Sequence, residues 1–292
     1  MLYQVRHLTR YRYAEPVSGS QHELHLVPRE SSRQRRLSCR LDIVPVPLVY
    51  RERTDYFGNP ATYVAIATPH SELTVVAESL VEVAESPTPR PQDDVPWEAA
   101  AEIAGAAASE LHAQEMALPS PFVGEMPSLR DYAMPSFPAG RPLLAACVDL
   151  MARIHRDFAY DPRATTIATP LTEVFAKRRG VCQDFSHLMI ACLRGLGLSA
   201  RYVSGYLVTK PPPGKPRLQG ADASHAWLSV LSPRFGFVDL DPTNDCLVGP
   251  EHVTLAQGRD FGDVTPLRGV IHGGGRHALH VAVDVIPQGT AP

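Results

Sequence analysis

The sequence of 292 residues contains no long hydrophobic run. No stretch approaches the roughly 18 consecutive apolar residues that a membrane-spanning helix needs. The first residues, MLYQVRHLTRYRYAEP, also lack the apolar centre of a signal peptide. Neither sign of charge is in excess, because 28 Lys and Arg stand against 31 Asp and Glu, for a net charge of -3. We therefore expect a cytoplasmic protein whose partners include neither a membrane nor a nucleic acid.

Cysteines with metal-binding or redox spacing are absent. The chain has five cysteines, an odd number, and none of them stands in a CxxC pattern. This argues against a disulfide framework and against a cysteine-ligated zinc site. We therefore expect free thiols, each to be judged by its own surroundings, at positions 39, 147, 182, 192 and 246.

Other metal-binding patterns are missing as well. Cys182, Asp184 and His187 are close in sequence, but at these offsets their side chains point in different directions around a helix. The acidic residues of the segment 251–263 do not follow the spacing of a calcium loop. We expect no metal and no other cofactor.

The composition, 44% hydrophobic and 20% charged, is typical of a globular protein. The chain is longer than a usual single domain, so we expect two domains. Residues 1–85 alternate between apolar and polar positions, which predicts an N-terminal antiparallel β-sandwich domain. One strand of this domain has five apolar residues on one face: Leu73, Val75, Ala77, Val81 and Val83.

A proline-rich segment, SPTPRPQDDVP at residues 86–96, follows this domain and predicts an extended linker. An alanine-rich helix is predicted over residues 97–112, whereas the prolines of residues 118–140 exclude one continuous helix there. We therefore treat residues 86–140 as a linker and bridging segment.

The remaining residues, 141–292, read as helices followed by antiparallel strands and a C-terminal strand. Apolar residues at steps of three and four predict a helix from Leu143 to Phe158. A second helix fits residues 171–178, and a third starts at Cys182. Helices that precede antiparallel strands indicate an α+β domain.

Cys182 stands between a glycine turn and the third predicted helix, in the stretch RRGVCQDFSHLMIACLRGLGL. The first backbone N–H groups of a helix are unpaired, and the aligned peptide dipoles favour negative charge there. This placement favours the thiolate form of Cys182 and makes it a candidate nucleophile.

Two further residues could complete a catalytic group. A thiolate nucleophile needs a base that can return a proton, and His225 starts a predicted strand in SHAWLSV. An acid that orients the imidazole is available in FVDLDPTND. Asp239 and Asp241 have the same strand parity, so alternation does not choose between them. We choose Asp241, because Pro242 ends the strand there.

The stretch GVCQDFSHLMIACLRGLGLSARYVSGY, followed by SHAW and DPTN, resembles the core of the transglutaminase-like superfamily. The opening YQVRHLTRYRY, the segment DYFGNP and the later GRDFGDVTPLRGV resemble other parts of its bacterial branch. The resemblance covers nearly the whole chain. It implies a papain-like core in which Cys182 is the nucleophile, His225 the base and Asp241 the orienting acid.

Residues that touch the substrate are harder to choose. An oxyanion hole should use the backbone N–H of Cys182 and a second donor that the sequence does not identify. Candidates for contacts with the substrate are Tyr160, Gln183, Asp222 and Trp227. Each of them has an alternative role, such as plain packing for the tryptophan.

The predicted function is that of a cysteine-dependent amide hydrolase that forms a thioester acyl-enzyme with a peptide or protein amide. Two alternatives stay open. The acyl-enzyme could pass its acyl group to an amine, as in a protein-glutamine acyltransferase. The triad could also be idle in a peptide-binding module, which would leave Cys182 no more reactive than Cys192.

Overall fold

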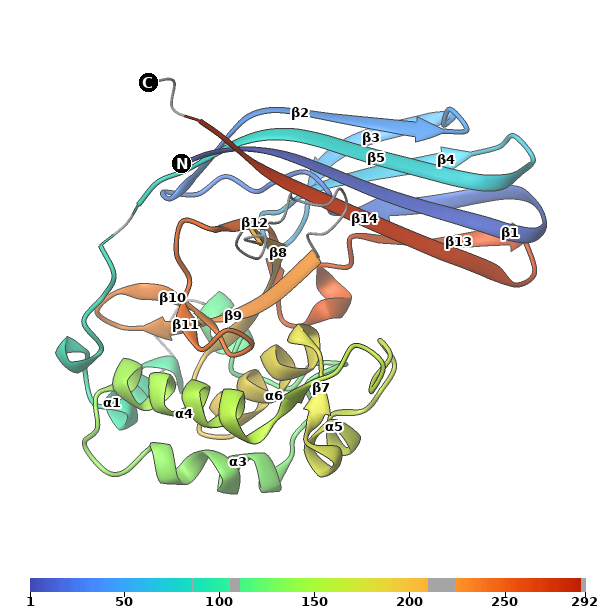
Figure 1. Ribbon diagram of the computed structural model, residues 1–292. Helices are drawn as coiled ribbons and strands as arrows, with labels where there is room; N and C mark the ends of the chain where they lie inside the picture. The colour runs from blue at the N-terminus through green and yellow to red at the C-terminus, as the bar shows by residue number, and fades with distance from the viewer. Residues whose placement is uncertain (86, 106–110, 210–223, 290–292) are drawn as a thin grey trace, which may run out of the picture.

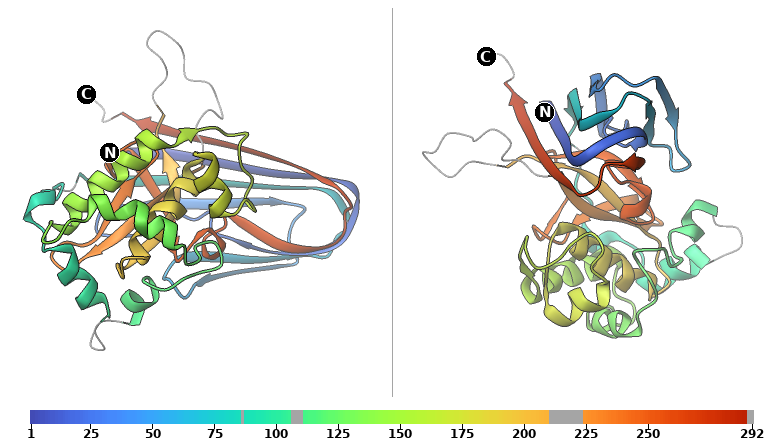
Figure 2. Two further views of the ribbon diagram at one scale, coloured as in Figure 1. Left: turned by 90° about the horizontal axis from the view of Figure 1, so that it is seen from below. Right: turned by 90° about the vertical axis from the view of Figure 1, so that its right-hand side faces the viewer.

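The computed structural model describes residues 1–85, 87–105, 111–209 and 224–289. A large antiparallel sheet, a smaller sheet and a group of helices lie one beneath another (Figure 1), and the end-on view in Figure 2 shows the same arrangement. The predicted α+β class with an N-terminal antiparallel β domain is confirmed.

The strands of the large sheet come from both ends of the chain. They are β1 (Leu2–Leu24), β2 (Gln34–Val44), β3 (Val49–Thr54), β4 (Pro60–Ile66), β5 (His70–Val83), β13 (Leu267–Gly273) and β14 (His277–Gln288). The order is β2-β5-β1-β4-β3, and β13 and β14 pair with β1. Leu2 is opposite Gln288, so the first and last strands are neighbours. The expected unit of residues 141–292 thus supplies strands to the large sheet as well as to the sheets formed within that unit.

The large sheet curls because β1 bends. The first part of β1 pairs with β5 and β14, its last part pairs with β4 and β13, and its register on β5 shifts between Arg12 and Val17. Buried residues of β1, β2, β4 and β5 form a core within this sheet. The alternation predicted for β5 is confirmed, since the five apolar residues expected on one face are all buried: Leu73, Val75, Ala77, Val81 and Val83.

The second sheet and the helices share one larger core. Its strands, in the order β11-β10-β9-β8-β12, are β8 (Ala200–Leu207), β9 (Ser224–Ser232), β10 (Gly236–Asp241), β11 (Cys246–Leu247) and β12 (His252–Gly258). A separate parallel pair consists of β6 (Ala159–Tyr160) and β7 (Arg179–Gly180).

The helices follow the apolar patterns of the sequence. They are α1 (Trp97–Gly105), α2 (Leu111–Glu115), α3 (Pro127–Ala133), α4 (Leu143–Asp157), α5 (Leu171–Lys177) and α6 (Cys182–Arg194), with short 3-10 turns at Pro91–Asp93, Met134–Ser136 and Phe261–Asp263. The apolar stripe of α4 is buried from Leu143 to Ile154, as predicted. No helix of the described part of the chain combines the length and apolar character needed to cross a membrane.

Two buried amide side chains of the β domain bind the outer edge of β12. Gln34 donates to the Thr254 carbonyl at 2.7 Å and accepts from the Thr254 N–H at 2.8 Å. Asn59 does the same with Gln257, at 2.8 and 2.9 Å. Both amides therefore reproduce the backbone pairing that another strand would provide. They fix β12, the edge strand of the second sheet, against the β domain.

Candidate active site

The start of α6 is built around Asp184. Its buried carboxylate accepts a hydrogen bond from the Val181 N–H at 2.8 Å and another from the Thr165 hydroxyl at 2.7 Å. A Cβ at Gly180 would come within 2.6 Å of this carboxylate, so glycine is needed there. The capping fixes the turn that presents Cys182 as the first residue of the helix. Cys182 is partly accessible there, whereas Cys192 on the same helix is buried.

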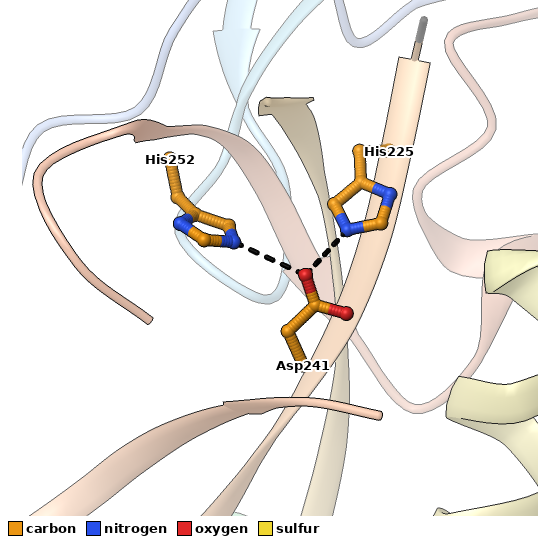
Figure 3. Close-up of side chains that lie close together, drawn as sticks. All are labelled: His225, Asp241 and His252. Atoms are coloured by element: carbon orange, nitrogen blue, oxygen red, sulfur yellow. Dashed lines mark hydrogen bonds and ion pairs between the residues drawn. The ribbon is translucent and has the colours of Figure 1, made fainter. Parts of the chain in front are cut away.

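His225 and Asp241 come together where β9 and β10 lie side by side. The His225 Nε2 atom is 2.7 Å from the Asp241 Oδ2 atom. The second ring nitrogen of His225 points away from the carboxylate (Figure 3). The imidazole is also close enough to the Cys182 side chain for the two groups to interact electrostatically. The structure therefore brings together the three residues that the sequence analysis selected.

Asp239, the alternative acid, has different partners. It is half-buried and accepts a hydrogen bond from the Ser229 hydroxyl. Asp241 is fully buried at the end of the strand, next to the histidine. A carboxylate at the end of β10, immediately before Pro242, is thus in position to contact the His225 imidazole.

The Asp241 carboxylate receives hydrogen bonds on both oxygens. Its Oδ1 atom accepts from the Thr243 and Asn244 N–H groups at 3.0 and 3.2 Å. Its Oδ2 atom accepts from the Asn244 side-chain amide at 2.7 Å and from His252 Nε2 at 3.2 Å, besides His225. Hydrogen bonds to a carboxylate stabilise its charged form. Burial opposes ionisation, but these bonds and the His225 charge outweigh it and hold the pKa of Asp241 below its ordinary value.

The charges around His225 change the pKa of its imidazole. Burial would lower the pKa of this imidazole, but hydrogen bonds with Asp241 and Cys182 and the attraction of their negative charges raise its pKa to about 10. The protonated form is thus favoured around neutral pH. A buried imidazolium between a carboxylate and a sulfur is an arrangement that can hold a proton ready for transfer.

The remaining candidate residues have different surroundings. Tyr160 pairs with Gly180 across β6 and β7, is 55% exposed, and has its pKa raised by burial and by the charge of Cys182. Gln183 lines a pocket of about 410 Å³ beside α6, together with His187. Trp227 is fully buried. Asp222 lies outside the described residues.

Trp227 packs beneath the histidines. Its ring lies 6.0 Å from the His225 ring and 5.2 Å from the His252 ring, measured between centroids. A Cβ at Gly205, which is opposite His225 on β8, would lie 2.4 Å from the indole. Gly205 therefore makes room for the indole, and the indole supports both imidazoles.

Sequence reasoning missed Asn244 and His252. Asn244 belongs to the DPTN motif, so the turn after the strand was a usable signal for it. His252 is 11 residues beyond Asp241 and on another strand, and no spacing rule connects them. His187 is not expected to bind a metal. In the structure its ring accepts a hydrogen bond from the Phe261 N–H at 3.1 Å, and burial lowers its pKa to about 3.

The atoms of His225, Asp241 and His252 that could bind a metal lie within 4.8 Å of one another. Both imidazole Nε2 atoms are hydrogen-bonded to the same carboxylate oxygen (Figure 3), and the Asn244 amide is bonded to it too. Metal binding would require both imidazoles to give up these N–H groups and the amide to turn. We therefore interpret the group as a hydrogen-bonded network.

Comparisons with known proteins identify the family of this chain. Residues 3–82 match the bacterial transglutaminase-like N-terminal region, and residues 138–242 match the transglutaminase-like superfamily. An uncharacterised protein of Mycobacterium tuberculosis is 44% identical over 98% of this chain and 92% of its own length. The chain belongs to the transglutaminase-like superfamily. Members of this superfamily are generally cysteine-dependent enzymes.

Two further proteins are similar to this transglutaminase-like chain. A crystal structure of a candidate cysteine protease from Cytophaga hutchinsonii superposes with a TM-score of 0.76 at 18% identity, covering 100% of this chain and 93% of that one. This likeness establishes the common fold. The protein-glutamine gamma-glutamyltransferase of Pseudomonas aeruginosa is 31% identical over 36% of this chain and 16% of its own length.

Proposed function

We propose that this protein is a cysteine-dependent amide hydrolase acting on a peptide or protein amide. The observation that carries the proposal is the position of His225, which is hydrogen-bonded to Asp241 and whose pKa is raised by both Asp241 and Cys182. This is the relation of nucleophile, base and orienting acid that acyl transfer through a covalent intermediate requires. Membership of a superfamily of cysteine-dependent enzymes supports it independently.

The reaction starts from a Cys182 thiolate beside a His225 imidazolium. The sulfur attacks the amide carbonyl, and a C–S bond forms while the carbonyl oxygen becomes an oxyanion. The Cys182 N–H, one of the unpaired donors at the start of α6, is available to this oxyanion. His225 then gives its proton to the departing amine as the C–N bond breaks, which leaves a thioester.

Hydrolysis of the thioester reverses the roles. A water molecule gives a proton to His225 and attacks the thioester carbonyl, and the C–S bond breaks to release a carboxylic acid. Asp241 remains charged throughout and keeps the imidazole oriented. Its burial and its hydrogen bonds suit this constant charge.

The nucleophile is tested with a library of peptide amides. Intact-mass measurement of the wild-type protein should find an acyl group on Cys182, and turnover of the same peptide should be lost in Cys182→Ala and in His225→Ala. Cys39→Ala, which removes a half-buried thiol of the β domain, is the matched control and should keep full turnover. Full turnover by Cys182→Ala would reject the proposal.

A second candidate function is acyl transfer to an amine. The similarity to a protein-glutamine gamma-glutamyltransferase over part of the chain favours it. Both functions form the same thioester, so they differ only in whether water or an amine attacks it. Adding a primary amine to the turnover assay and weighing the products separates them: a dominant amide product indicates a transferase, and a dominant carboxylic acid a hydrolase.

A further inference from the structure

His252 and His225 are hydrogen-bonded to the same oxygen of the Asp241 carboxylate, but they lie on different strands, β12 and β9. It is 5% exposed, and its Nε2 atom is 3.2 Å from Asp241 Oδ2. Its other ring nitrogen, Nδ1, is buried and has no hydrogen-bond partner among the described residues. Nε2 is therefore the ring nitrogen placed to donate to Asp241.

Three donors surround Asp241 Oδ2, and only one of them takes part in proton transfer. His225 changes its bonding during the proposed reaction, whereas the Asn244 amide and His252 remain in place. A carboxylate rotates easily about its bond to Cβ unless hydrogen bonds oppose the rotation. The fixed donors keep Oδ2 aimed at His225 when the imidazole exchanges its proton.

We propose that His252 is a positioning residue that holds the Asp241 carboxylate in line with the His225 imidazole and, through it, keeps the imidazole beside Cys182. The inference rests on the triad assigned under Proposed function. It concerns alignment, because His252 has no contact with the sulfur among the interactions of the described residues.

The strand that carries His252 is unusually well fixed. β12 pairs with β8 on one side, and the Gln34 and Asn59 amides bind its other edge. The His252 ring also meets the buried Trp227 ring edge-on. The β domain thus helps to fix the position of His252, and through His252 it contacts the Asp241 carboxylate of the proposed triad.

The test measures the reactivity of Cys182 and needs no amide substrate. Wild type, His252→Gln, His252→Asn and His252→Leu are treated with iodoacetamide over a pH series, and mass spectrometry follows the peptide that contains Cys182. Glutamine can carry an amide N–H to about the place of histidine Nε2, whereas asparagine is one methylene shorter. The Gln and Asn variants therefore form a matched pair that differs in reach alone.

We expect His252→Gln to react at close to the wild-type rate. His252→Asn and His252→Leu should react about tenfold more slowly at about pH 6, an effect of the size expected for one hydrogen bond to a charged group. The difference should shrink at high pH, where any thiol ionises. With a substrate in hand, the same two variants should lower kcat and leave KM unchanged.

Cys192 reports on folding in the same experiment, because it is buried and stays unmodified while the protein is folded. A wild-type profile for His252→Leu with Cys192 protected overturns the proposal. So does a His252→Gln protein that is as slow as His252→Asn. If the leucine variant unfolds, the Gln and Asn pair decides. Failure of Cys182→Ala to abolish amide turnover would refute the hydrolase and leave this reactivity measurement unaffected.

Discussion

Two places in this protein bury a pair of histidines, and they differ in what surrounds the rings. In the candidate active site, His225 and His252 both face the Asp241 carboxylate. In the β domain, His22 and His70 are buried near each other, and neither nitrogen of His22 has a hydrogen-bond partner among the described residues. The pKa of His225 is raised to about 10, whereas burial and the nearby His70 lower the pKa of His22 to about 4.

Burial alone does not decide the charge of a histidine in this protein. Removal from water disfavours the cation at both places. At the candidate active site the Asp241 carboxylate and the Cys182 side chain reverse the outcome, because their interactions with the imidazole act in a medium that screens them weakly. The β domain offers His22 no such partner among the described residues, so the ring stays neutral over most of the pH range.

The largest effect is expected from removing the carboxylate. Asp241→Asn should lower the pKa of His225, because the charge that favours the imidazolium is lost while the burial remains. Activity should fall on the order of 10²- to 10⁴-fold, the usual contribution of a positioned acid or base. The measurement is kcat/KM with any peptide amide that acylates Cys182.

Asp239→Asn is the matched control for this variant. It removes a carboxylate from the same strand, one that is bonded to Ser229. Its activity should stay close to that of the wild type. Equal losses in the two variants would mean that the strand as a whole, and no specific charge, supports the activity.

A smaller effect is expected in stability at acid pH. The folded-state pKa of His22 is about 4, below the ordinary value of 6.5, so the unfolded chain takes up a proton first as pH falls. This group therefore destabilises the folded state progressively from about pH 6.5 to about pH 4. His22→Leu should flatten the decline of the unfolding free energy over this interval, as measured by urea denaturation.

Other histidines limit how flat the curve becomes. The pKa of His7 is also lowered by burial to about 4, so part of the slope should remain in His22→Leu. His280→Gln, which changes an exposed histidine of β14, should follow the wild-type curve. A slope unchanged by His22→Leu would show that His22 titrates alike in the folded and unfolded chain.

The smallest effect concerns the neighbour of His22. His70 contributes a repulsion that adds to the larger cost of burial in lowering the pKa of His22. His70→Gln should therefore raise the pKa of His22 while leaving it below the ordinary value. An NMR titration of the His22 ring protons measures the change. If the pKa of His22 is unchanged or lower in His70→Gln, burial accounts for the whole lowering of that pKa.

The sequence predicted those parts of the molecule that depend on local pattern. The 3.6-residue period located α4, alternation located the inner face of β5, and the glycine before Cys182 marked the start of α6. The three residues of the proposed triad were found because their residue types and their order in the chain matched a known chemistry. Proline after Asp241 indicated the strand end at which the carboxylate meets His225.

Features that depend on distant pairing were not predictable in this way. Nothing local indicates that His252 reaches across to Asp241, since their meeting depends on the order of strands in the sheet. The role of Gln34 could not be predicted either, because it depends on the β12 backbone to which its side chain is hydrogen-bonded. Asp184 was noticed only as a metal candidate, and its capping of Val181 depends on the path of the turn.

The pairing of Leu2 with Gln288 sets the order in which the molecule can be completed during synthesis. One side of β1 has no partner until the ribosome has made β13 and β14. An uncovered strand edge invites pairing with other chains. The helices and the second sheet emerge meanwhile, so one side of β1 is the last to be covered, and removing β1 or β14 damages the same sheet.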